Sequence, residues 1–212
     1  MQRAGRRTGL IAGLSAVIAA AVWFLAPLPG DGRVRLGFAS QTLYAPPVDQ
    51  WRASIGASVC TDGRPAEITG VDIDTLGDLE VAEVYLFTLT PEEIRRGGVG
   101  LFGSARGTPP GFEEPYADAG SYEGSFEDPI GRMVTTPCPD GSRSRAPTDD
   151  QQSLVVVFDV GPEGGRVGEV EVSYASLGRT REVELERDDE ELDVRLCGSQ
   201  ERGGGCRVLS GR

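Results

Sequence analysis

Glutamates at alternate positions in two C-terminal segments are the clearest candidates for chemistry in this chain: Glu169, Glu171, Glu182 and Glu184. One valine stands between the two glutamates of each segment, and such alternation is typical of strands with one polar and one buried face. A turn around residues 176–178 joins the segments, so a hairpin is predicted.

The register of this hairpin follows from the side-chain pattern. If Val172 and Val183 share the buried face, the sequence positions of any two paired residues add up to an odd value of about 355. That register places Glu171 opposite Glu184 and Glu169 opposite Glu186, and like charges in such positions are unfavourable. Nearby arginines are expected to neutralise the strip in part: Arg179, Arg181 and Arg187.

Three interpretations of this acidic strip remain open. It is a solvated face, a surface for a basic partner or a divalent cation, or a set of carboxyls whose raised pKa values would suit acid–base chemistry. Exposure argues against large pKa shifts. Together with Leu101 and Phe102 in a glycine-rich segment, the four glutamates are the candidate partner-binding residues.

A second set of carboxylates partly matches a calcium loop: Asp72, Asp74, Asp78 and Glu83. Asp72, Asp74 and Glu83 fall at the first, third and twelfth positions of the EF-hand pattern, and Gly77 falls at its sixth. The fifth position is Leu76, which cannot be a side-chain ligand, and the flanking segments resemble strands rather than helices. The alternatives are a Ca²⁺ site and a plain hairpin turn with polar faces.

The residue types that are absent exclude many reactions. The chain contains no histidine, lysine or asparagine. A Ser-His-Asp triad, a Cys-His pair, a lysine base and a histidine-ligated metal are therefore excluded within this chain. A hydrolase that uses only carboxylates, as glycosidases do, stays open. Its candidates lie in one loop, although nothing in the sequence sets their separation: Glu113, Glu114, Glu123, Glu127 and Asp128.

Four cysteines indicate an oxidising environment: Cys60, Cys138, Cys197 and Cys206. Their spacings match neither a zinc site nor a redox pair, so structural disulfides are predicted. We expect Cys60 to pair with Cys138 and Cys197 to pair with Cys206.

Short segments of period-two alternation dominate the chain and must position these residues. Strands are expected at 34–38, 55–59, 66–74, 79–89, 154–160, 169–174, 182–186 and 192–196. Gly70 marks a predicted bulge, and residues 84–87, apolar on both faces, are expected to be central. The predicted fold is all-β, an immunoglobulin-like β-sandwich.

One long glycine- and proline-rich loop, residues 97–150, interrupts this pattern. A single helical turn precedes it, with Thr90 as N-cap, Pro91 at the first position and Glu93 completing a capping box. Because apolar residues and Cys138 lie within the loop, we expect it to be a partly ordered excursion from the sheet, to which a disulfide of Cys138 connects it.

A single transmembrane helix is predicted to precede the β domain. Residues 10–28 carry no charge and are just long enough to span a bilayer. Arg3, Arg6 and Arg7 orient residues 1–9 towards the cytoplasm and residues 29–212 outside it. The segment ends with bulky residues and prolines, which favours an uncleaved signal anchor over a cleaved signal peptide.

The net charge of −12 excludes nucleic acid as the expected partner. We expect a non-enzymatic binding or accessory domain of a bacterial cell envelope, tethered to the membrane, with an envelope protein or glycan as its partner. The alternatives are a calcium-stabilised structural module and a carboxylate-only glycan hydrolase.

Overall fold

The computed structural model describes residues 31–38, 41–46, 49–96, 103–112, 124–138, 150–186 and 193–199. The strands are β1 Val34–Phe38, β2 Gln41–Leu43, β3 Trp51–Thr61, β4 Ala66–Leu89, β5 Ser104–Thr108, β6 Gly111–Phe112, β7 Ser125–Glu127, β8 Met133–Val134, β9 Gln151–Ser176, β10 Arg179–Glu186 and β11 Val194–Cys197. One short helix, α2, spans Pro91–Arg95. The all-β prediction is confirmed.

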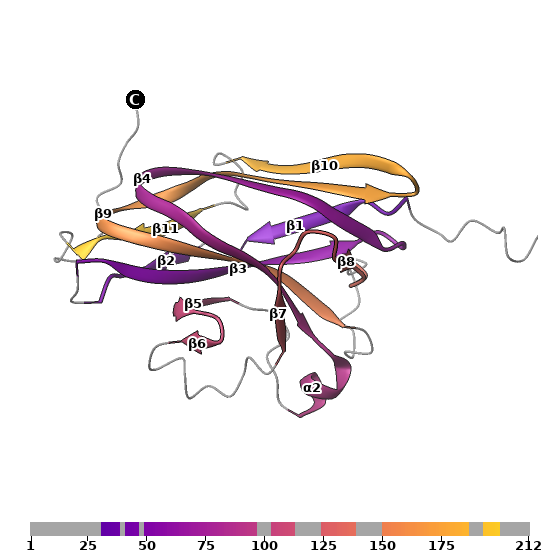
Figure 1. The fold of residues 1–212 in the computed structure, drawn as a ribbon, viewed down its shortest axis with the longest axis horizontal. Coiled ribbons are helices and arrows are strands. Elements are labelled where there is room, and N and C mark those ends of the chain that lie inside the picture. The colour runs from indigo at the N-terminus through magenta and orange to yellow at the C-terminus, as the bar shows by residue number, and fades with distance from the viewer. Residues whose placement is uncertain are drawn as a thin grey trace, which may run out of the picture.

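Two long antiparallel strands, β4 and β9, run side by side through the whole sheet (Figure 1). The sequence predicted two strands in each of these regions, and that prediction is wrong. Residues 72–83 form part of β4 rather than a hairpin turn. The ladder bends at four register shifts, one of them between Ile68 and Gly70, so the bulge predicted at Gly70 is confirmed.

Because β4 and β9 both curve, the sheet has two layers that enclose one core. The first half of β9 pairs with β3, and its second half pairs with β10. β1 extends the first layer by pairing with β3, and Figure 1 shows β10 along the upper edge of the molecule, above β1. Inward-facing side chains of both layers meet in a single cluster that includes Leu36, Ile55, Phe158, Val172 and Leu185.

A second, smaller apolar cluster covers the outer face of the first layer. Phe87 and Val155 project outward from β4 and β9, and Phe112 and Phe126 pack with them. The rings of Phe87 and Phe126 lie 4.7 Å apart between centroids. Leu86 meanwhile faces the main core, which confirms that residues 84–87 are covered on both faces.

The described residues within the predicted loop 97–150 include strands that join the sheet, and we call this segment the excursion. Its described residues include β5 to β8, and β7 and β8 both pair with β4. Helix α2 begins as predicted, since the Thr90 side chain accepts a hydrogen bond from the Glu93 backbone N–H and the Glu93 carboxylate accepts one from the Thr90 N–H. That capping interaction lowers the pKa of Glu93.

Residues 133–138 fasten the end of the excursion to the sheet, and we call them the anchor segment. Cys138 forms the predicted disulfide with Cys60, and its backbone N–H donates to the carbonyl of Thr61 at 3.0 Å. Cys197 is disulfide-bonded as well, while Cys206, its predicted partner, lies outside the described residues.

The predicted membrane segment, residues 10–28, also lies outside the described residues. Within the described part of the chain, no helix has the length and apolar character that crossing a bilayer requires.

Candidate functional site

The β9–β10 hairpin has the register that the side-chain pattern predicted. Val183 pairs with Val172, so the paired numbers sum to 355, and Glu184 pairs with Glu171. Glu186 pairs with Glu169 at the end of the ladder. The outer surface of this hairpin therefore carries carboxylates directly opposite one another on neighbouring strands.

Strand β4 extends the same surface on the other side of β9. Asp72 pairs with Glu171, and Asp74 pairs with Glu169. Paired residues project from the same face of a sheet, so carboxylates of three adjacent strands share one outward face. We call this set the acidic face: Asp72, Asp74, Glu169, Glu171, Glu182 and Glu184.

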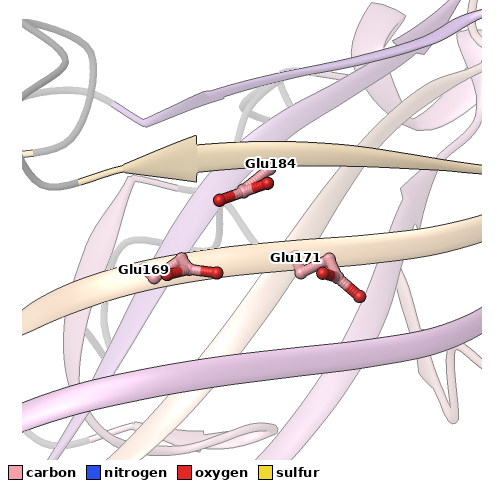
Figure 2. Close-up of side chains that lie close together, drawn as sticks. All are labelled: Glu169, Glu171 and Glu184. Carbon is pink, nitrogen blue, oxygen red and sulfur yellow. The ribbon is translucent and has the colours of Figure 1, made fainter.

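Glu171 lies at the centre of this face. One carboxylate oxygen from each of Glu169, Glu171 and Glu184 lies within 4.8 Å of the others. Figure 2 shows the three side chains on the neighbouring strands β9 and β10. The pKa of Glu171 is raised, first by the negative charge of Glu182, then by partial burial, and then by Glu184, Asp72 and Glu169. The arrangement therefore favours binding a positive charge or a proton.

Two of the three arginines expected to neutralise the strip, Arg179 and Arg181, do not lie on it. Arg181 pairs with Tyr174, a core residue, so it belongs to the opposite face, where its guanidinium lies 3.1 Å from the Asp31 carboxylate. Arg179 follows the same alternation, and Arg187 lies outside the described residues. Among the residues that the structure describes, no arginine forms an ion pair with the acidic face.

The four residues of the predicted calcium loop are distributed along β4 and do not converge. Asp72 and Asp74 belong to the acidic face. Asp78 lies against Gly161 and accepts a hydrogen bond from the backbone N–H of Glu163. Glu83 lies farther along the strand, beside Val157.

Asp78 and Glu83 have surroundings of their own on the outer side of the sheet. Asp78 lines an open cavity of about 420 Å³ together with Glu80 and Asp159. The Arg52 guanidinium lies 2.8 Å from the Asp159 carboxylate and 3.5 Å from that of Glu83. Glu83 also accepts a hydrogen bond from the hydroxyl of Tyr85, which raises the pKa of that tyrosine.

Two of the five hydrolase candidates lie within the described residues. The Glu127 carboxylate lies 3.4 Å from the Arg132 guanidinium, and the Asp128 carboxylate accepts a hydrogen bond from the Ile130 N–H. The other three lie outside the described residues: Glu113, Glu114 and Glu123. Leu101 and Phe102, the predicted contact point, lie outside them as well.

Sequence reasoning missed that Asp72 and Asp74 belong with the glutamates. The signal was present, because residues 66–74 alternate with the same period as residues 169–174. The alternation did not, however, specify which strands are neighbours.

Comparisons with protein-family models, with curated proteins and with solved structures found no match for this chain.

Proposed function

We propose that this chain is a membrane-tethered, extracytoplasmic binding or accessory domain of a bacterial cell envelope and that it has no enzymatic activity. Residues 1–9 are then cytoplasmic, residues 10–28 form a single transmembrane helix, and residues 29–212 lie outside the membrane. The two-layered all-β architecture around one core and the Cys60–Cys138 disulfide support an exported domain, for which we retain the immunoglobulin-like sandwich as the proposed fold.

The acidic face is the proposed contact surface, and a cationic segment of an envelope protein is the proposed partner. One observation carries this proposal: six carboxylates share one outward face, and no arginine among the described residues pairs with them. A partner that brings positive charge would relieve the repulsion around Glu171. Opposite charges of this kind accelerate association and select partners more than they add affinity.

Crosslinking through the exported domain in cells, followed by identification of the co-purified protein, tests the proposal. We expect one dominant basic partner, whose capture falls as salt rises and is lost in the double variant Glu171→Arg, Glu184→Arg. The matched control is Glu92→Arg, which reverses an exposed carboxylate on α2. Equal capture by all three proteins would reject the acidic face as the contact surface, and capture of a glycan alone would reject a protein partner.

A calcium-stabilised structural module is the second candidate. The observation that favours it is the approach of three carboxylate oxygens, one each from Glu169, Glu171 and Glu184, to within 4.8 Å of one another. Oxygen ligands of this kind suit Ca²⁺. A ligand that binds only the folded state raises the melting temperature, so added Ca²⁺ should stabilise the wild-type protein more than Glu184→Gln. No difference between the two proteins would exclude this candidate.

The carboxylate-only hydrolase remains an untested prediction, because no observation on the described residues favours it over the two proposals above.

A further inference from the structure

The turn between β9 and β10 holds a leucine in a conformation that leucine avoids. Leu177 has φ 54° and Gly178 has φ 70°, so both central residues of the turn are left-handed. Such turns favour asparagine, aspartate or glycine, whereas a bulky side chain at positive φ is strained. The Leu177 side chain is also 55% exposed. An apolar residue that is both strained and exposed contributes little to folding, which points to a role outside the fold.

This turn lies beside the point where the chain enters the domain. The Cα of Gly32 packs so closely against Ser176 that a Cβ on Gly32 would collide with the serine hydroxyl. The Gly32 N–H donates to the carbonyl of Asp62 at 3.1 Å. The Asp31 carboxylate lies 3.1 Å from the guanidinium of Arg181, which follows the turn on β10. Figure 1 shows the beginning of β1 and the β9–β10 turn at the same end of the sheet.

Chain length limits how far this end can be from the membrane. The predicted membrane segment ends at Leu28, three residues before Asp31. An extended chain spans at most about 3.6 Å per residue, so Asp31 lies within about 11 Å of the end of that segment. Because Asp31 and Gly32 are fixed to the turn, Leu177 is held close to the headgroup region.

The surroundings of the turn suit a lipid interface. Arg179 is exposed and follows Leu177 by two residues, and the Arg33 side chain, 66% exposed, lies 4.0 Å from the Asp31 carboxylate. Long arginine side chains at such positions extend towards phosphate groups while their apolar stems stay among the lipids. A second exposed apolar residue lies at this end of the sheet. Met133 is 44% exposed, and it is near the turn since Glu67 pairs with Met133 on one side and with Ala175 on the other.

We propose that the β9–β10 turn is a second membrane contact, in which Leu177 inserts into the interfacial region of the bilayer that holds the predicted helix. This inference rests on the proposed membrane tether and extends it, since the domain would be held in one orientation on the surface. The acidic face extends from the turn along β9 and β10. When the turn contacts the lipid, the end of the acidic face that is remote from the turn therefore points away from the membrane. The occupant of the contact is a lipid surface, not a second copy or a soluble ligand.

The test uses the full-length protein in nanodiscs that contain anionic and zwitterionic phospholipids. A nitroxide label replaces one side chain, in Leu177→Cys or in the matched control Tyr44→Cys. Tyr44 is 57% exposed and follows β2. β2 is linked through β11 to residues 164–166 of β9, far along that strand from the turn. The ratio of collisions with lipid-soluble oxygen to collisions with a water-soluble nickel chelate should be several-fold higher at position 177 than at position 44.

A second measurement needs no substitution at the turn. Lipids that carry a nitroxide on the headgroup should broaden the backbone amide signals of residues 176–179 in the wild-type protein and leave those of residues 41–43 sharp. Equal collision ratios and equal broadening would overturn the second contact. Extraction of the membranes with alkaline carbonate separates this failure from that of the proposed function. Release of the protein would overturn the tether and the second contact together, whereas retention with a water-exposed turn would overturn only the contact.

Discussion

Gln152 holds the anchor segment against the sheet, and its replacement by methionine is the most informative stability test. The side chain is 4% exposed. Its Oε1 accepts hydrogen bonds from the backbone N–H groups of Thr135 at 2.7 Å and Thr136 at 3.2 Å. Its Nε2 donates to the carbonyl of Met133 at 3.0 Å. One amide therefore satisfies three backbone groups of the anchor segment, of which only Met133 and Val134 pair with β4.

Methionine has a similar shape but removes all three of these hydrogen bonds. A hydrogen bond of this kind contributes about 1 kcal/mol net, so Gln152→Met should lower the free energy of unfolding by about 3 kcal/mol. For a domain of this size, 1 kcal/mol corresponds to about 2–4 °C in melting temperature, which gives an expected decrease of about 6–12 °C. The Cys60–Cys138 disulfide should stay intact, because it fixes the same segment covalently.

Thermal unfolding of the full-length protein in detergent micelles, followed by circular dichroism, measures the effect. Gln41→Met is the matched control, because the buried Nε2 of Gln41 has no hydrogen-bond partner. That substitution should change the melting temperature little, or raise it, since it removes an unsatisfied polar atom. Equal melting temperatures for the two variants would refute the role assigned to Gln152.

Three further predictions follow from other parts of the molecule. Replacing Cys60 and Cys138 by alanine opens a loop with a sequence separation of 78, and should cost about 4.5 kcal/mol in urea unfolding; a cost below about 1 kcal/mol would contradict it. The pKa of Glu171 is raised above its usual 4.5, first by the negative charge of Glu182. The folded state therefore favours the protonated form of Glu171, and the stability that this form contributes below pH 4.5 is lost as pH rises through the raised pKa. Glu171→Gln should therefore melt increasingly above the wild type from acidic to neutral pH, and a constant difference would count against the repulsion. Leu177→Asn should stabilise the micellar protein by about 1 kcal/mol, because asparagine tolerates the left-handed turn, whereas a loss of stability in urea would show that Leu177 supports the fold.

Local patterns were sufficient wherever neighbouring residues decide the structure. The alternation around Val172 and Val183 fixed the hairpin register, since a slip of one residue would turn every valine outward. Thr90, Pro91 and Glu93 specified the start of α2 because capping depends on residues within one turn.

The sequence patterns did not predict those parts of the structure that depend on pairing between segments far apart in the chain. Gly77 resembled a turn, yet β4 continues through it because β9 supplies a partner on either side of the bulge. The acidic face could not be assembled from sequence for the same reason. Asp72 and Asp74 join the glutamates only through pairing between β4 and β9, which are separated by the whole excursion.

The backbone strain at Leu177 could not be predicted from the sequence either. The segment Ser176-Leu177-Gly178 was expected to be a turn, but the type of turn depends on the twist of the strands that it joins.

The order of segments along the chain also constrains how this protein reaches its folded state. The β4–β9 ladder joins segments far apart in sequence, and such non-local pairing is slow to form. Cys60 and Cys138 both precede β9, so if the chain is exported as proposed, this disulfide can close before β9 has crossed the membrane. The oxidised loop would then hold β3 and β4, the two strands that flank β9, in one covalently closed segment, and β9 would complete the sheet by pairing with both of them.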